Sequence, residues 1–391
     1  MGPLKGIKVL DLSRVLAGPY CTMMMADFGA DVIKIEPPKV GDDSRAFTPF
    51  LGTESAYFMS LNRNKRSMSL DFKNPKHCEI FKEMVKQADV VVENYRPGTM
   101  EKFGLGWDVL KEINPRLIYA ACSGFGRTGP YTKKPAYDVV VQAMGGIMSI
   151  TGEKGGHPMR VGASVGDVFA GLFTCLGVLM ALYHRVSSGK GQLVDVAMLD
   201  CQVAILENAV ARYVCTGTPP GPIGNRHPSI TPFADFTSKD GSIIVGSGND
   251  RLWKKLCDVM GKPEWVNDPR FDSNPHRTEN VEELTVLMNE VLKTRTTKEW
   301  IAELEAAGVP CAPINNVAQV MEDPSIIARN MIVEVEHPVA GKLKVPGVPI
   351  KMSDTPGEVL TPAPLLAADT NEIMKEFFGW DEATTKAKLG E

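Results

Sequence analysis

Short β-rich runs alternate with longer amphipathic stretches over the first 125 residues, and this alternation constrains the fold more than any other feature of the chain. Such alternation is typical of an α/β layer built around a mostly parallel sheet. No Gly-x-Gly-x-x-Gly sequence follows the β-rich runs, so the usual dinucleotide-binding fingerprint is missing and a nicotinamide or flavin enzyme is disfavoured. The expected strands are residues 7–12, 31–36, 67–72, 89–93 and 117–123, and the expected helices are residues 18–28 and 75–87.

The chain is too long for a single core. Cores stop growing at about 250–300 residues, so 391 residues predict two domains or one domain with a large insert. Helices are expected at 165–185 and 199–215, and the Gly and Pro residues of 217–228 predict a linker. A smaller unit should follow from residue 242, with a strand at 243–246 and helices near 250–260, 281–294 and 298–307.

Charge and cysteine usage exclude several classes of protein. The formal net charge is −4, from 43 Lys and Arg against 47 Asp and Glu, and the charges are spread along the chain. A nucleic-acid partner is therefore not expected, because phosphate backbones need a concentrated basic surface. The eight cysteines stand singly, without a Cys-x-x-Cys pair, so neither a disulfide framework nor a metal site is indicated.

The longest uncharged apolar run, Val168 to Tyr183, has 16 residues, slightly short of the roughly 20 that span a membrane. We interpret it as a buried core helix and expect no membrane partner. The N-terminal sequence lacks a basic region followed by an apolar core, so a cytoplasmic protein is the simplest expectation.

Asp167 is the most suggestive ionisable residue, because it precedes this apolar run in the glycine-rich sequence 162–171. Ser164 followed three residues later by Asp167 fits a variant of the capping box, in which the acid only satisfies backbone N–H groups. On spacing alone this structural interpretation is favoured. The functional alternative is a nucleophile or general base, with a helix N-terminus stabilising its negative charge.

Two further features have a structural and a functional interpretation. The segment 135–146, which contains Tyr137 and Asp138, fits a helix start followed by a glycine turn. The basic stretches 62–66 and 94–102 fit solvated loops, which is the usual place for such charges. Alternatively, loops at strand ends form the ligand crevice of open α/β sheets, and these charges then hold the phosphates of a nucleotide-like cofactor.

In this order along the chain, the motifs resemble the class III CoA-transferase family, also called the formyl-CoA transferase or carnitine dehydratase family. The resemblance covers nearly the whole chain and is closest to acetyl-CoA:oxalate and succinyl-CoA:dicarboxylate CoA-transferases. The matching segments are 10–19, 29–36, 64–67, 93–98, 114–119, 124–126, 137–138, 166–167 and 189–192.

The resemblance implies an α/β fold with a Rossmann-like large domain over 1–215, completed by 330–391, and a smaller α+β domain over 225–325. It also implies a partner, a second copy of the chain, because two chains of this family thread through each other as an interlocked-ring homodimer. Asp167 falls on the family's catalytic aspartate, which carries the acyl group as an anhydride and then CoA as a thioester. CoA is thus a substrate and product, and no permanently bound cofactor is expected.

The family's CoA-contacting positions carry over residue by residue, with Arg96 and Lys102 as the best candidates for phosphate binding. This chain departs from the formyl-CoA:oxalate transferases at Pro37, where those enzymes carry an arginine. It also lacks their long glycine-rich loop. The matching positions here are Leu16, Ala17, Leu70, Asp71, Phe72, Lys73, Asn94, Tyr95, Arg96, Lys102, Ala136, Tyr137 and Asp138.

Two alternatives to CoA transfer stay open. The α-methylacyl-CoA racemases resemble this sequence around Asp167 but carry histidine at the position of Tyr137, and tyrosine, with a pKa of about 10, fits proton exchange poorly. A non-catalytic CoA-binding protein is the other alternative, although a scaffold needs no acid at Asp167 beyond a cap. For transfer, the expected acceptor is a small dicarboxylate such as oxalate or succinate, with Arg226 or His227 facing its free carboxylate.

Overall fold

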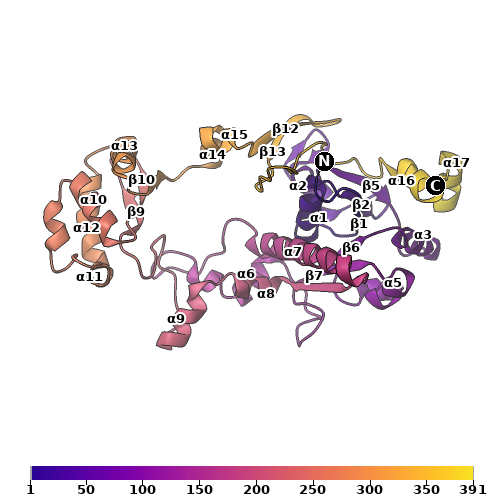
Figure 1. Cartoon of the computed structure of the whole chain (residues 1–391), viewed down its shortest axis with the longest axis horizontal. Helices are drawn as coiled ribbons and strands as arrows, with labels where there is room; N and C mark the ends of the chain where they lie inside the picture. The colour runs from indigo at the N-terminus through magenta and orange to yellow at the C-terminus, as the bar shows by residue number, and fades with distance from the viewer. Residues whose placement is uncertain (1, 391) are drawn as a thin grey trace. The chain divides into compact units, whose positions relative to one another are not determined.

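The structure is a computed structural model that describes residues 2–390, and its chain divides into two compact units (Figure 1). The first unit contains the chain through Met148, Arg160–Gly217, and the chain from Pro324 onward. The second unit contains Ser149–Met159 and Thr218–Asp323. Both ends of the chain therefore belong to the first unit.

A six-stranded parallel sheet forms the centre of the first unit, in the order β5-β2-β1-β6-β7-β8. Doubly wound sheets use this order, and they bind ligands at the carboxyl ends of the strands where the order reverses, here between β1 and β6. The strands are β1 (Lys8–Asp11), β2 (Asp31–Glu36), β5 (Lys65–Ser69), β6 (Val90–Glu93), β7 (Ile118–Ser123) and β8 (Leu193–Ala197).

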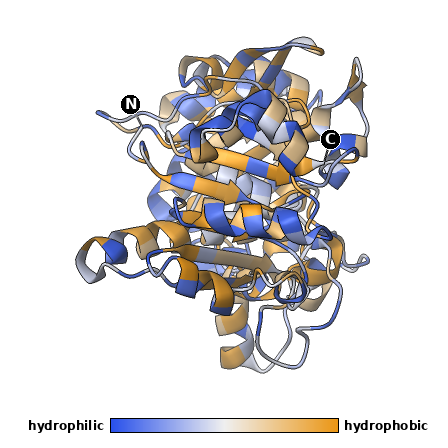
Figure 2. Cartoon of the chain, turned by 90° about the vertical axis from the view of Figure 1, so that its right-hand side faces the viewer, coloured by the Kyte–Doolittle hydropathy of each residue, from blue (hydrophilic) through white to orange (hydrophobic). Residues whose placement is uncertain are grey.

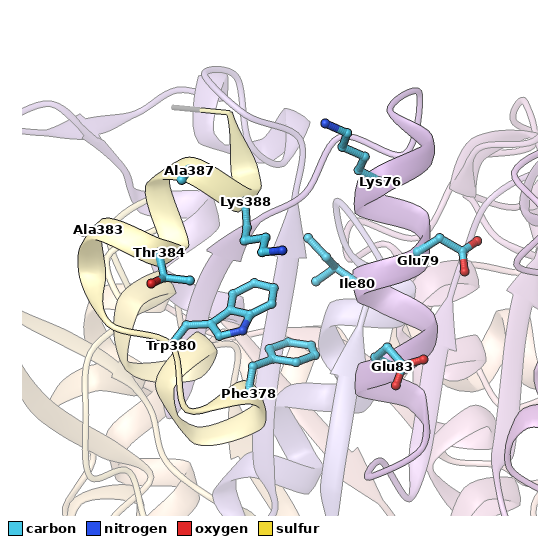
Figure 3. Close-up of a pocket in the computed structure, with 10 residues that line it drawn as sticks. All are labelled: Lys76, Glu79, Ile80, Glu83, Phe378, Trp380, Ala383, Thr384, Ala387 and Lys388. Atoms are coloured by element: carbon cyan, nitrogen blue, oxygen red, sulfur yellow. The ribbon is translucent and has the colours of Figure 1, made fainter.

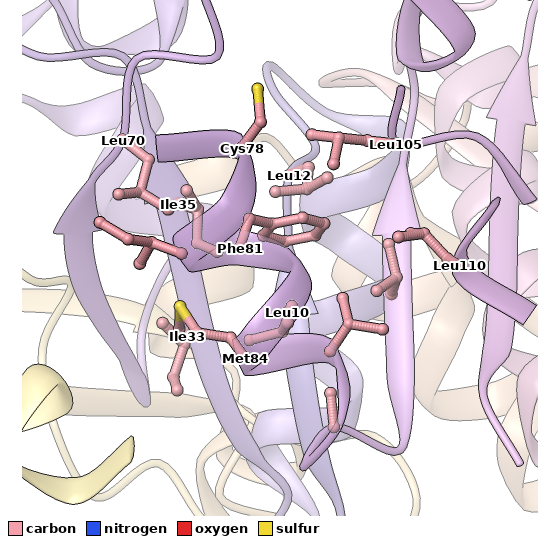
Figure 4. Packing of buried hydrophobic residues seen from close by; sticks show 14 of the residues in the cluster. Leu10, Leu12, Ile33, Ile35, Leu70, Cys78, Phe81, Met84, Leu105 and Leu110 are labelled. Carbon is pink, nitrogen blue, oxygen red and sulfur yellow. The ribbon is translucent and has the colours of Figure 1, made fainter. Parts of the chain in front are cut away.

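Helices cover both faces of this sheet, because successive strand residues point to opposite faces. Val9 packs with helices α1 (Ala17–Asp27) and α7 (Val165–Ser188). Leu10 packs on the other face, whose helical layer is α3 (Pro75–Val85), α5 (Trp107–Ile113), α16 (Thr370–Phe378) and α17 (Glu382–Leu389). Figure 4 shows this second core around Phe81 and Met84, and Figure 2 shows hydrophobic strands between the helices.

One strand begins earlier than the sequence pattern predicts. Residues 67–72 were the expected strand, but β5 is Lys65–Ser69. Lys65 is buried, and its Nζ lies 3.0 Å from Asp11 Oδ2 of β1. A charged side chain thus occupies an interior strand position that an apolar pattern does not reveal.

Helix α7 includes the predicted range 165–185 and continues to Ser188, where Gly189 ends it with a φ of 69°. By length and composition it is apolar enough to cross a membrane, and 39% of its most apolar window is buried. The prediction of a core helix is correct for one face only. Ala170, Gly171 and Val178 are buried, whereas Met180, Tyr183 and Val186 are 61%, 83% and 85% exposed.

The predicted helix 199–215 is wrong as one element, because it is interrupted. The structure has α8 (Met198–Ala204) and α9 (Asn208–Thr216), and Glu207 between them has a φ of 54°. Apolar residues continue through Ile205 and Leu206, and no glycine or proline marks the interruption in the sequence. The break was therefore invisible in the pattern.

The second unit has its own sheet and its own core. The antiparallel strands β9 (Phe233–Thr237), β10 (Ser242–Gly246) and β11 (Cys311–Pro313) run in the order β11-β10-β9. They pack with Trp253 and Trp300. The indole N–H of Trp300 donates to Leu292 O at 2.7 Å. The helices are α10 (Asp250–Val259), η3 (Pro263–Asn267), α11 (Asn274–Glu279), α12 (Val281–Leu292), α13 (Thr297–Ala307) and α14 (Val317–Glu322).

The remaining elements are short. They are η1 (Asp43–Ala46), β3 (Phe50–Leu51), β4 (Glu54–Ser55), α2 (Ala56–Leu61), α4 (Thr99–Lys102), α6 (Asp138–Met144), η2 (Met148–Ile150), α15 (Pro324–Ala328), β12 (Ile332–His337) and β13 (Gly341–Pro346).

Candidate active site

Asp167 lies in the first turn of α7, where backbone N–H groups and the helix dipole stabilise negative charge. The capping-box interpretation is wrong, because Ser164 makes no side-chain capping hydrogen bond there. The half-buried Asp167 carboxylate has no hydrogen-bond donor among residues 2–390. A carboxylate placed this way is free to react.

Asp138 fixes the peptide just before Asp167. It is 8% exposed, and its Oδ1 accepts a hydrogen bond from Gly166 N at 2.8 Å while its Oδ2 accepts one from Gln142 Nε2 at 2.8 Å. A Cβ on Gly166 would lie 2.7 Å from Val141 Cγ2 and 2.9 Å from Asp138 Oδ1. The Gly166-Asp167 sequence therefore reflects the close approach of α6 to the start of α7.

Burial, and secondly the negative charge of Asp138, raise the pKa of Asp167 to about 7. Both effects disfavour the ionised carboxylate. The resulting carboxylate is more basic than an ordinary aspartate and is still partly ionised at neutral pH, which suits a nucleophile or a general base.

Tyr57, on α2, is close enough to Asp167 for the charge of that carboxylate to act on its hydroxyl, and it was missed by the sequence analysis. Burial, and then the charges of Asp167, Asp42 and Asp138, raise the pKa of Tyr57 to about 12. Its hydroxyl therefore remains protonated at neutral pH. In the sequence, Tyr57 stands in the run Ala-Tyr-Phe-Met-Ser-Leu, which indicates only a core helix.

A cavity of about 700 Å³ brings together six of the predicted CoA contacts at the carboxyl ends of the strands. These are Leu70, Asp71, Phe72, Lys73, Tyr95 and Arg96. Arg14 and Lys39, which the sequence analysis did not select, line the same cavity as Pro37. Four cationic side chains thus surround this space, and clustered Arg and Lys residues bind phosphates.

The other predicted contacts are not among the residues that line this cavity. Lys102 is exposed at the end of α4, and Tyr137 is 77% exposed at the N-cap of α6. Leu16 is the N-cap of α1 and Ala17 its first residue, and both are buried. Helix α7 packs closely against Ala17, because a Cβ on Gly171 would lie only 2.6 Å from Ala17 O. Ala136 packs against Gly124, because a Cβ added to Gly124 would lie only 2.1 Å from the Cβ of Ala136.

Asn94 and Asp11 hold the loop 13–15, which connects β1 to α1. Asn94 Oδ1 accepts a hydrogen bond from Arg14 N, and its Nδ2 donates to Arg14 O, both at 2.8 Å. Asp11 Oδ1 accepts from Ser13 N at 2.9 Å. Asn94 thus acts on the backbone of a residue that lines the cavity.

A buried ion pair completes the support of this loop. Lys34 Nζ lies 2.8 Å from Asp42 Oδ2, and both side chains are at most 1% exposed. Lys34 also donates to Ser13 O at 2.8 Å, while Asp42 accepts from Val15 N at 3.0 Å. Val15 has a φ of 65°, which β-branched residues rarely adopt, so these bonds hold an unfavourable backbone conformation in place.

Arg226 and His227, the predicted acceptor-binding residues, belong to the second unit. His227 Nδ1 accepts a hydrogen bond from Ser229 N at 3.2 Å, and its ring lies 5.6 Å from that of Phe233. Arg226 lines a small apolar pocket with Phe233 and Met288. The predicted role of these two residues remains a prediction.

A second large cavity, of about 960 Å³, lies between α3 and α17 (Figure 3). Its lining includes Ile80, Phe378 and Trp380, together with Lys76 and Lys388. The predicted site residues are absent from its lining, so we do not assign it to the active site.

Comparisons with known proteins agree with the motifs. A family model described as CoA-transferase family III matches residues 4–370. The human succinyl-CoA:glutarate CoA-transferase is 39% identical over 97% of this chain and 87% of its own length. The acetyl-CoA:oxalate CoA-transferase of Acetobacter aceti is 44% identical over 96% of both chains. The crystal structure of a CAIB/BAIF family protein from Brucella suis is 39% identical, with a TM-score of 0.87 over 96% of this chain and 99% of that chain.

Proposed function

Because the chain belongs to CoA-transferase family III and is a CoA-transferase, we propose that it moves CoA from an acyl-CoA to a small dicarboxylate, with Asp167 as the covalent carrier. The acceptor class is supported by the glutarate and oxalate transferases to which the chain is similar. The observation that carries the role of Asp167 is a carboxylate with a pKa of about 7 and without a hydrogen-bond donor among residues 2–390.

The reaction proceeds by four displacements at carbonyl carbons. The Asp167 carboxylate attacks the thioester of the donor, forming an acyl-aspartyl anhydride and releasing CoA thiolate. The thiolate attacks the aspartyl carbonyl, which releases the donor acid and forms an aspartyl-CoA thioester. The acceptor carboxylate attacks the aspartyl-CoA thioester, which forms a second anhydride and releases CoA thiolate again. This thiolate attacks the acceptor's acyl carbon, giving the new acyl-CoA and restoring the Asp167 carboxylate. The acyl groups remain activated as anhydrides or thioesters throughout, and one thioester replaces another over the whole cycle, provided that water is excluded.

The residues around Asp167 supply position rather than proton transfer. Asp138 holds Gly166 N and so orients the first turn of α7. The Tyr57 hydroxyl can donate to the oxyanion that develops at each carbonyl, because its raised pKa keeps it protonated.

Trapping of the acyl-enzyme tests this mechanism. After incubation with acetyl-CoA and then hydroxylamine, we expect mass spectrometry to find the modification on the peptide that contains Asp167. The Asp200→Asn variant is the control, because Asp200 also lies in the first turn of a helix but is exposed. If no adduct forms and the α-proton of a 2-methylacyl-CoA exchanges with deuterium, racemisation replaces transfer as the function.

The cavity at the strand ends is the proposed site for the adenosine phosphates of CoA. The support for this proposal is the cluster of cationic side chains that line the cavity, Arg14, Lys39, Lys73 and Arg96. They can replace the arginine that the formyl-CoA:oxalate transferases carry at the position of Pro37. Lys102, at the end of the adjacent α4, is a further phosphate-binding candidate. Crystals soaked with CoA should show the 3′-phosphate beside these side chains, and density elsewhere would contradict the assignment.

The first unit is proposed as the CoA-binding domain and the second as the small domain of an interlocked homodimer. The support is the exposed apolar face of α7, with Met180, Tyr183 and Val186, since apolar patches of this kind usually mark interfaces. We expect light scattering to give the mass of two chains, and Tyr183→Glu to lower both that mass and the activity. A fully active monomer would disprove the dimer.

A further inference from the structure

Arg160 lies close to Asp167, the proposed carrier, and its guanidinium group has no strong partner among residues 2–390. It precedes α7, its Nη2 donates to Gly162 O at 3.1 Å, and the same nitrogen lies 3.5 Å from Asp138 Oδ2. The side chain of Arg160 is 46% exposed. Charge-assisted hydrogen bonds are usually about 2.7–2.9 Å long, so the contact with Asp138 is a weak one.

Asp138 does not depend on Arg160 as a partner. Both of its oxygens already accept hydrogen bonds at 2.8 Å, from Gly166 N and Gln142 Nε2. Arginines that serve the fold look different in this chain: Arg63 makes two hydrogen bonds to Asp27, at 2.7 and 3.0 Å, with both side chains buried. Arg160 therefore keeps most of its donors available for a ligand.

The backbone around Arg160 is anchored to the structure that positions Asp167. Val161 N donates to Gln142 Oε1 at 2.8 Å, and Gln142 in turn donates to Asp138. Asp138 thus contacts Arg160 with one oxygen and Gly166, the residue before Asp167, with the other. The guanidinium group is held beside the first turn of α7.

We infer that Arg160 binds the remote carboxylate of the dicarboxylic acceptor while its other carboxylate reacts at Asp167; this rests on the function proposed above. The two carboxyl carbons of a small dicarboxylate lie close together, from about 1.5 Å in oxalate, where they are bonded directly, to about 5 Å in extended glutarate. A guanidinium group binds a carboxylate through two parallel hydrogen bonds, which fixes orientation as well as adding affinity. An acceptor without the second carboxylate leaves Arg160 solvated.

A matched pair of acceptors tests the inference, with acetyl-CoA as the donor throughout. Glutarate and pentanoate have the same chain length, but pentanoate has a methyl group in place of the second carboxylate. For Arg160→Gln, we expect the ratio of kcat/KM for glutarate to kcat/KM for pentanoate to fall roughly 10- to 100-fold, because a charged hydrogen-bonding group is lost. The loss should appear in the KM for glutarate, and Arg160→Lys should restore part of it.

Arg226→Gln is the comparison variant, because Arg226 is the rival candidate for the same carboxylate. A fall in the ratio with Arg226→Gln and none with Arg160→Gln would overturn the inference. An equal loss on both acids with Arg160→Gln would also overturn it, since that pattern indicates a disturbed Asp138. A wild-type protein that transfers CoA to none of glutarate, succinate and oxalate would instead overturn the proposed function, and with it the role of Arg160.

Discussion

Asp167→Asn should lower kcat for CoA transfer on the order of 10⁴-fold, because it replaces the carboxylate that the proposed mechanism uses as nucleophile and covalent carrier. An amide oxygen is a poor nucleophile, and the variant keeps the size and shape of the side chain. Steady-state transfer from acetyl-CoA to glutarate or oxalate measures the effect. In the wild type, kcat/KM should rise with pH through about 7, as the carboxylate of free Asp167 ionises.

The same substitution should stabilise the protein at alkaline pH. The folded-state pKa of Asp167 is raised from 3.8 to about 7, so folding disfavours the ionised form and wild-type stability falls as pH rises across this interval. Above pH 7 the cost is on the order of 4 kcal/mol, and Asp167→Asn removes it. Below pH 4 both states of the wild type are protonated, so the gain should vanish.

Urea unfolding of both proteins at pH 4 and pH 8.5 measures this difference. Asp200→Asn is again the matched control and should leave the transfer rate and its pH profile unchanged. If Asp167→Asn destabilised the fold at pH 8.5, the carboxylate would have a structural partner and the nucleophile assignment would lose its basis. A residual rate close to that of the wild type would contradict the mechanism directly.

Sequence patterns predicted the sheet of the first unit well, because strands such as β6 and β7 are buried along their whole length and consist mostly of apolar residues. The prediction failed where chemistry or backbone geometry departed from that pattern. Strand β5 starts at Lys65, a charged residue whose buried ammonium group pairs with Asp11 of β1, two strands away in the sheet. The break at Glu207 has no glycine or proline to mark it.

The candidate site divides in the same way. Asp167 was found because it stands in a distinctive glycine-rich motif, and Asp138 because it lies in another. Tyr57 stands in an apolar helix, and its role depends on a carboxylate 110 positions later in the chain. Contacts of this kind arise from the fold and have no local signature. The pairing of Lys34 with Asp42 likewise depends on how the chain turns after β2.

Lys34→Met should destabilise the first unit by about 3–5 kcal/mol, because it leaves Asp42 as a buried charge without its cation. Burial by itself would lower the pKa of Lys34, but Asp42 and Asp11 raise it to about 12. Burial by itself would raise the pKa of Asp42, but Lys34 lowers it to about 2. The stabilisation is therefore complete from about pH 4 to about pH 10, and is lost as pH falls toward 2 or rises toward 12.

Loss of this pair should also affect substrate binding, which separates it from a general loss of stability. Without Lys34, Ser13 O loses its donor and Asp42 loses the cation that holds it beside Val15 N. We then expect the strained φ of Val15 to relax and the loop that presents Arg14 to the proposed CoA cavity to lose its shape. We expect the KM of the variant for acetyl-CoA to be raised even at urea concentrations well below its unfolding midpoint, where the protein is folded. Its kcat should be less affected. Lys8→Met is the matched control, because Lys8 pairs with Glu376 at 2.6 Å on the surface, where such a pair contributes about 0–1 kcal/mol. If Lys34→Met proved as mild as Lys8→Met in both urea unfolding and KM, the buried pair would have neither role.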